Sequence, residues 1–141
     1  MQLVGVVGLW FALLFPIHYI DPELKPYTDA YDRITSEYCG WDDYIEPRQT
    51  IVMFSDLDQP KIGVCINYGF GWVIQIDKTF WSKASVEDKF HLVAHERSHC
   101  VLGLGHVSND WSSYMYPSIE QIPIKLVMYQ VLADAKRICS K

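Results

Sequence analysis

The chain has 141 residues, of which 50% are hydrophobic and 21% are charged, and this is enough for one compact core but not for two ordinary domains. Its formal net charge is -5, and its 12 lysine and arginine residues form no basic stripe. Proteins that bind the phosphate backbone of nucleic acids usually carry such a stripe, so we expect no nucleic-acid partner.

The N-terminal segment is apolar. Residues 3–20 contain no formally charged side chain, and their number suits either the core of a signal peptide or a marginal membrane span. No Lys or Arg precedes the segment, no small-residue cleavage site closes it, and Pro16 interrupts it, which favours an uncleaved anchor. A strand or helix of the folded domain is the alternative. We expect residues 1–20 to be a signal or anchor segment and the place of any membrane contact. Residues 21–141 would form an extracytoplasmic domain that is either secreted or membrane-anchored.

The first half of this domain predicts one helix and three strands. Helical spacing of apolar residues from Tyr27 to Tyr38, with Pro26 before them and Gly40 after them, predicts a first helix. Three segments rich in β-branched and aromatic residues are predicted strands: residues 50–55, 61–67 and 72–77. The turn YGFG at 68–71 joins the last two strands as a hairpin.

The second half predicts two helices. Ser85 is a good N-cap, with Asp88 three residues later, and a helical pattern runs from Val86 to about Leu102. After a loop, residues 124–138 predict a closing helix with Pro123 near its start. Because strands and helices mix in this order without an internal repeat, we expect a single α+β domain.

Four cysteines allow two disulfides with three possible pairings, and they are too far apart in the sequence for a zinc ribbon. If the N-terminal segment exports the chain, an oxidising compartment favours disulfide formation. The preferred pairing is then Cys39 with Cys65 and Cys100 with Cys139. Buried reduced thiols are the alternative.

Three of the five histidines lie within residues 95–106, in the stretch HERSHCVLGLGH. His95 and His99 are four residues apart, and on a helix such positions point to the same side, so both imidazoles can reach one ion at about 2.0 to 2.1 Å. Glu96 lies on the flank of that face, where its carboxylate can approach an open position of the metal. A third helical ligand would strain a tetrahedral site, so the third ligand should come from beyond the helix.

That third ligand is His106, which follows Gly103 and Gly105, two residues that permit a left-handed turn at the end of the helix. Further on, the stretch SYMYPS contains Met115 and Pro117. The combination of HExxH, a glycine-containing bend, a third histidine and a Met-x-Pro turn resembles the metzincin zinc endopeptidases, especially the matrixins. A bacterial and bacteriophage group of small metzincin-like proteins, with HExxHC and one extra residue before the third histidine, is more similar still. The resemblance covers about residues 25–139.

The resemblance implies a zincin fold, with a first helix and a twisted, mostly parallel sheet with an antiparallel edge strand before the active-site helix, and a Met-turn and C-terminal helix after it. It implies one Zn²⁺ per chain, bound by His95, His99 and His106, with Glu96 as the general base. Met115 and Pro117 would form the Met-turn, with Met115 as a hydrophobic floor beneath the metal. The protein would hydrolyse peptide bonds in a protein or peptide substrate. The strand at 72–77 would bind that substrate by backbone pairing.

The chain departs from the matrixin pattern at two places. His106 comes seven residues after His99 rather than six, which rotates the exit of the helix by about 100°, and we expect Gly105 to absorb this rotation. Arg97 stands where the family has an apolar residue, so we expect it to face solvent or a carboxylate. A ladder of His91, His95 and His99 on the helix is an alternative ligand set, but it would leave His106 unused.

Two other functions are also compatible with the sequence. The first is a catalytically silent metal-binding module, an accessory part of a larger assembly such as a virus particle or an envelope complex, held there by its apolar N-terminus. The second is cleavage of peptidoglycan peptides. Replacement of Glu96 separates an enzyme from the silent module, because only an enzyme needs this carboxylate.

Overall fold

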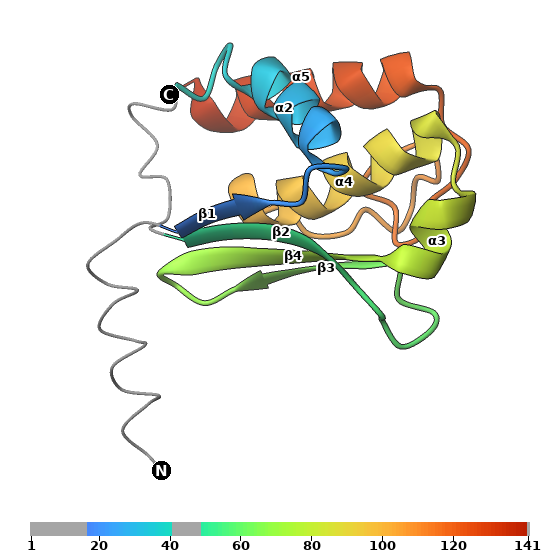
Figure 1. Ribbon diagram of the computed structural model, residues 1–141. Coiled ribbons are helices and arrows are strands. Elements are labelled where there is room, and N and C mark those ends of the chain that lie inside the picture. The colour runs from blue at the N-terminus through green and yellow to red at the C-terminus, as the bar shows by residue number, and fades with distance from the viewer. Residues whose placement is uncertain (1–16, 41–48, 141) are drawn as a thin grey trace.

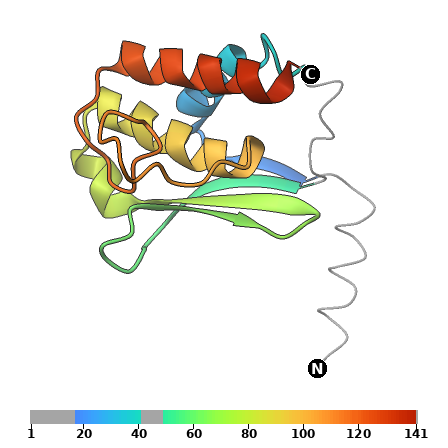
Figure 2. The same ribbon diagram turned by 180° about the vertical axis from the view of Figure 1, so that it is seen from behind.

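A computed structural model describes residues 17–40 and 49–140 and has an α+β fold, as the sequence predicts (Figure 1). Its elements are β1 (Ile17–Ile20), α2 (Lys25–Thr35), β2 (Gln49–Ser55), β3 (Gly63–Asn67), β4 (Gly71–Asp77), α3 (Lys78–Lys83), α4 (Val86–Val101) and α5 (Ile124–Cys139). Helix α4 lies directly over one face of the sheet, and α2 and α5 lie beyond it (Figures 1 and 2). Because α4 is covered by the sheet on one side and by helices on the other, most of its residues are buried.

The sheet has the strand order β1-β2-β4-β3. Strands β1, β2 and β4 are parallel, and β3 is antiparallel to β4, which confirms the predicted hairpin. The prediction that residues 72–77 form the edge is wrong, because β4 lies between β2 and β3. A hairpin signal does not say which of its two strands faces the rest of the sheet. The more apolar strand takes the central position, with Trp72, Ile74 and Ile76 buried against the helices.

The sheet begins inside the apolar N-terminal segment. Residues 17–20 form β1, which pairs in parallel with the first half of β2. Residues 1–16 lie outside the described residues, and so does the predicted signal or anchor role of that stretch. Within the ranges that the structure describes, no helix combines the length and apolar character needed to cross a membrane.

The ends of the helices follow local capping. The Ser85 hydroxyl accepts a hydrogen bond from the backbone N–H of Asp88, so α4 begins where the sequence predicts. Helix α2 ends at Thr35, earlier than its apolar pattern predicts, and the chain continues in a turn to Cys39. The short helix α3 was not predicted. The Asp77 carboxylate caps it by accepting from the N–H of Phe80, a signal hidden at the end of a strand.

The four cysteines form two disulfides, Cys39–Cys139 and Cys65–Cys100, with Cα atoms 5.1 and 5.8 Å apart. The predicted pairing is therefore wrong. It favoured neighbours in sequence, whereas the fold brings the turn after α2 beside the end of α5, and the edge strand β3 beside α4. The second bridge fixes β3 to the helix that carries His95 and His99.

A partly buried ion pair joins α2 to α4. The Arg97 guanidinium, only 3% exposed, pairs with the Asp32 carboxylate and lies 5.7 Å from the centre of the Tyr31 ring. Of the two environments expected for Arg97, solvent or a carboxylate, the structure shows the carboxylate. The Asp32 carboxylate compensates the charge of Arg97, which explains why a charged residue is tolerated in the middle of the layered structure.

We expect Asp32→Ala to destabilise the protein by about 3 kcal/mol, because it leaves the buried Arg97 guanidinium without its counter-ion. The measurement is the free energy of unfolding in urea. Asp29→Ala, which removes the exposed partner of Lys25 on the same helix, is the matched control and should cost less than about 1 kcal/mol. Equal effects of the two substitutions would show that the Arg97 pair contributes no more than a surface pair.

Candidate metal centre

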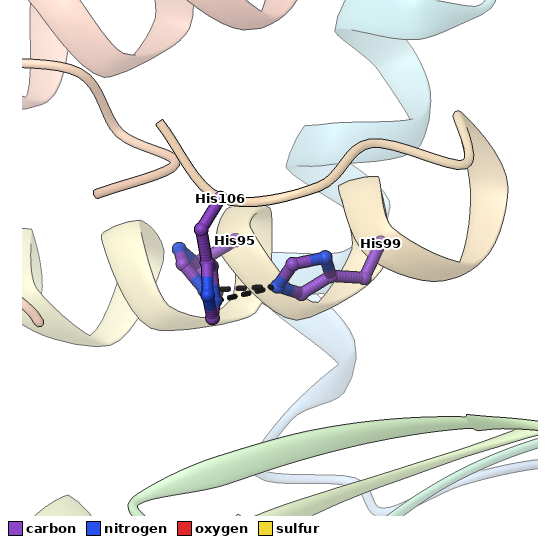
Figure 3. Close-up of side chains that lie close together, drawn as sticks. All are labelled: His95, His99 and His106. Atoms are coloured by element: carbon purple, nitrogen blue, oxygen red, sulfur yellow. Dashed lines mark hydrogen bonds between the residues drawn. The ribbon is translucent and has the colours of Figure 1, made fainter. Parts of the chain in front are cut away.

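Three imidazole rings converge at one point, two from α4 and one from the loop that follows it (Figure 3). The Nε2 atoms of His95 and His99 are 3.1 Å apart, and that of His106 lies 3.2 Å from the first and 3.1 Å from the second. The helix places the first two by their four-residue spacing, as predicted. The structure therefore brings all three predicted metal ligands together.

Backbone carbonyls orient two of these rings. His95 Nδ1 lies 2.9 Å from the carbonyl oxygen of Tyr114, and His99 Nδ1 lies 2.6 Å from that of Leu104. A carbonyl oxygen only accepts, so each Nδ1 must carry the proton and donate it. In the neutral rings, both Nε2 atoms then present lone pairs toward the centre of the cluster.

The short contact between His95 and His99 is therefore not a hydrogen bond between neutral rings, because neither Nε2 atom has a proton to donate. Burial opposes a positive charge on either ring: it lowers the pKa of His95 to about 4 and also lowers that of His99. A single metal ion would resolve the conflict by accepting the lone pairs of both rings, with His106 available as a third donor. The residues present thus fit one metal ion, with His106 as the most exposed ligand.

The loop after α4 brings His106 back to the helix. Gly103 has a φ of +66°, the left-handed conformation that commonly ends a helix, and the Leu104 N–H donates to the Ser98 carbonyl. Just after the histidine, the Val107 N–H donates to the carbonyl oxygen of Met115 over 2.9 Å. The prediction that Gly103 makes the turn is confirmed. Gly105, which was expected to absorb the rotation from the extra residue, has no positive φ, so of these two glycines only Gly103 takes the left-handed conformation.

Glu96 is buried between α4 and the edge strand β3. A Cβ atom at Gly63 would lie 2.7 Å from its Oε1, so only glycine permits this approach. The carboxylate also accepts a hydrogen bond from the backbone N–H of Cys65. It opens into a pocket of about 320 Å³ that His95 and His106 also line. The predicted general base and two of the predicted ligands therefore share one cavity.

The burial of Glu96 controls its ionisation. Loss of water around the carboxyl raises its pKa from 4.5 to about 7, and the hydrogen bond from Cys65 opposes this only in part. A carboxylate with a raised pKa is a stronger base than an exposed one, and it gains or loses its proton near neutral pH. In this chain, the effect comes mainly from burial of the carboxyl.

In the metal-free protein, this raised pKa should make stability depend on pH. Folded Glu96 retains its proton between pH 4.5 and about 7 whereas the unfolded residue loses it, so stability falls as the pH rises through that window. Between about pH 5 and pH 8 we expect a loss of about 2.5 kcal/mol. The measurement is the difference in urea unfolding free energy between the chelated parent and Glu96→Gln. Both proteins retain His95, whose lowered pKa makes stability rise with pH. This contribution is common to both proteins and cancels in the difference. A difference that is flat with pH would contradict the buried placement of the carboxyl.

The alternative ligand set that includes His91 is not supported by the structure. The ring of His91 is buried, and both its nitrogens face backbone carbonyls: Nε2 lies 3.0 Å from that of Tyr114 and Nδ1 lies 3.2 Å from that of Glu120. This histidine supports the loop that orients His95, and its ring nitrogens face these carbonyls rather than the three-histidine cluster.

The groups that support the loop at residues 112–117 were not predicted from the sequence. Gln130 of α5 accepts from the Tyr114 N–H and donates to the Ser112 carbonyl, over 2.8 and 2.9 Å. The Tyr114 hydroxyl lies 3.0 Å from Ser98 Oγ and 3.1 Å from an Asp134 oxygen. The only signal in the sequence is that Gln130 and Asp134, two polar residues of α5, are four residues apart and so lie on the same side of the helix. Through these bonds, the last helix fixes the carbonyl that orients His95.

The predicted Met-turn residues lie in this loop. Met115 is buried and 2% exposed, and Pro117 lines the pocket that contains Glu96. The position of the Met115 side chain beneath a metal remains a prediction. Pro117 is close enough to the cavity to shape one of its walls.

The candidate metal centre combines several features of a hydrolytic site. It contains one buried carboxylate, three converging imidazoles and a shared pocket, and the order of these residues along the chain is that of the predicted motif. No protein-family model, curated protein or solved structure matches the chain.

Proposed function

We propose that the protein is a zinc-dependent endopeptidase of the metzincin type. The observation that carries this proposal is the shared pocket. A buried carboxylate of raised pKa opens into the same cavity as two histidines of a three-histidine cluster. A metal site with a structural role needs no such carboxylate beside it, and four ligands usually close it.

Zinc suits this donor set best. Four-coordinate zinc binds imidazole nitrogen at about 2.0 to 2.1 Å, which places two such nitrogens about 3.3 Å apart. The distances between the Nε2 atoms, 3.1 to 3.2 Å, are close to this value. Among the described residues, the cluster contains three imidazoles and no thiolate or carboxylate as a fourth ligand. One coordination position is therefore left open, as a hydrolytic site requires.

The catalytic chemistry divides between the metal and Glu96. Zinc in such a site supplies Lewis-acid chemistry, because it lowers the pKa of water and polarises a carbonyl group. Glu96 accepts the proton of the attacking water and then donates it to the leaving amine. The N–H of Cys65 and the close approach of Gly63 hold the carboxylate in one orientation during both transfers.

The substrate would lie along β3 rather than along β4. In the described sheet β3 pairs only with β4, so its other side is the edge that an extended peptide can extend. The first residue of β3, Gly63, contacts Glu96, so a peptide bound there would pass the carboxylate. Apolar residues beside the edge, Ile62 and Leu92, line the same cavity. We therefore propose proteins or peptides in extended conformation as substrates.

An extracytoplasmic location agrees with the cysteines. Both disulfides are present, and such bridges form and persist in oxidising compartments. The bridge from Cys65 to Cys100 also connects the proposed substrate strand to the helix that carries the metal ligands.

The decisive experiment combines metal analysis with turnover. Purified protein should contain one zinc per chain and cleave casein, and phenanthroline should abolish cleavage until zinc is restored. Peptidoglycan fragments assayed in parallel would reveal a cell-wall substrate. A protein that binds zinc but shows no chelator-sensitive turnover of any of these substrates would instead be the silent metal-binding module.

A further inference from the structure

The face of the sheet that points away from α4 carries almost no charge. In each strand, the positions that alternate with the core residues form this outer face, which no described helix covers (Figures 1 and 2). Its apolar members include Ile17, Tyr19, Ile51, Met53, Val64 and Val73. Asp77 is the one charged residue at these positions in the described strands, and its carboxylate caps α3.

An outer face of this kind is unusual for an open sheet. Sheets with one face in water normally alternate apolar and polar residues, whereas parallel strands are almost always covered on both faces. Here three of the four strands are parallel, and the outer face is mostly apolar, with Gln49, Ser55 and Gln75 as its uncharged polar members. Nevertheless, Ile17, Tyr19 and Met53 are 46%, 50% and 36% exposed. Such a contiguous apolar surface indicates that something covers it.

The chain itself supplies a matching segment. Residues 3–15, LVGVVGLWFALLF, are apolar and uncharged, and they lead through Pro16 directly into Ile17, whose side chain belongs to the outer face. A helix of this length is about 20 Å long, enough to cross four strands whose outer members lie about 14 Å apart. It is short for the 30 Å core of a bilayer.

We propose that residues 3–15 fold back and cover the outer face of the sheet. A lipid surface is the less suitable occupant, because surfaces that lie on membranes combine apolar residues with Lys or Arg, and the outer positions contain neither. The net charge of -5 gives no attraction to anionic lipids either. Covalent attachment at Ile17 keeps the segment at high local concentration beside the face.

Chymotrypsin cleavage of the full chain after Trp10 tests this proposal. Met53→Glu places a carboxylate in the outer face, and Tyr129→Glu places one on α5, where the side chain is 69% exposed. The parent and Tyr129→Glu should resist cleavage, and Met53→Glu should be cut at least about tenfold faster, because the segment detaches before it is cut. Mass spectrometry gives the rate, and circular dichroism shows whether each variant is folded.

A second variant keeps the test valid if Met53→Glu fails to fold. Tyr19→Glu changes a half-exposed residue at the rim of the same face and should also speed cleavage after Trp10. Three results would overturn the proposal. The parent and both outer-face variants could be cut at equal rates. Protection could arise only when phosphatidylcholine vesicles are added, which would indicate a membrane. The purified protein could also begin after residue 15, so that nothing remains to cover the sheet.

Discussion

Glu96→Gln is expected to reduce turnover of a peptide substrate by about 10³-fold while the protein retains its zinc. A general base of this kind contributes about 10² to 10⁴ to the rate, and glutamine cannot accept the proton. The residue contacts Gly63 and Cys65 through its stem and one oxygen, so an amide of the same shape should fit the pocket. The measurement is kcat/KM together with the zinc content of the same sample.

Glu87→Gln is the matched control, because it makes the same chemical change on an exposed residue of the same helix. It should leave both kcat/KM and zinc content unchanged. If Glu96→Gln retained most of the activity with full zinc content, another group would have to act as base and the proposed mechanism would be wrong. If it lost zinc as well, the carboxylate would be part of the metal site rather than the base beside it.

His99→Ala is expected to remove the metal and, with it, all turnover. The variant keeps two imidazoles, which bind zinc far more weakly than three, and it also loses the Nδ1 bond to Leu104 that fixes the turn after α4. The measurements are zinc per chain after gel filtration, turnover, and stability with added zinc. A site that zinc fills at about 1,000 times its Kd stabilises the fold by about 4 kcal/mol, and the variant should not gain this stabilisation.

Two other histidines complete this test. His106→Ala should behave like His99→Ala, because its Nε2 atom lies as close to the cluster centre. His18→Ala, on the exposed strand β1, should keep its zinc and its activity. Full zinc content in His106→Ala would mean that the helix binds the metal without the loop, and the proposed three-histidine site would then be wrong.

Features that depend on near neighbours in the chain were predicted from the sequence. The start of α4 at Ser85 and the common direction of His95 and His99 follow from capping and from the geometry of one helix turn. The β3–β4 hairpin and the turn at Gly103 are likewise local. In each case the interacting groups are a few residues apart, so the backbone conformation alone fixes their relation.

Only the tertiary structure decided which distant surfaces meet. The edge position of β3, the two disulfide pairings and the contact of Gly63 with Glu96 depend on how the sheet packs on α4. The pKa of the proposed base is raised by that same packing, and the carbonyl that orients His95 is held by α5. The sequence by itself determined the three histidines of the candidate metal centre and the helix that carries two of them, because these features are local. The environment that makes them a site was decided by contacts between distant segments, which no local pattern encodes.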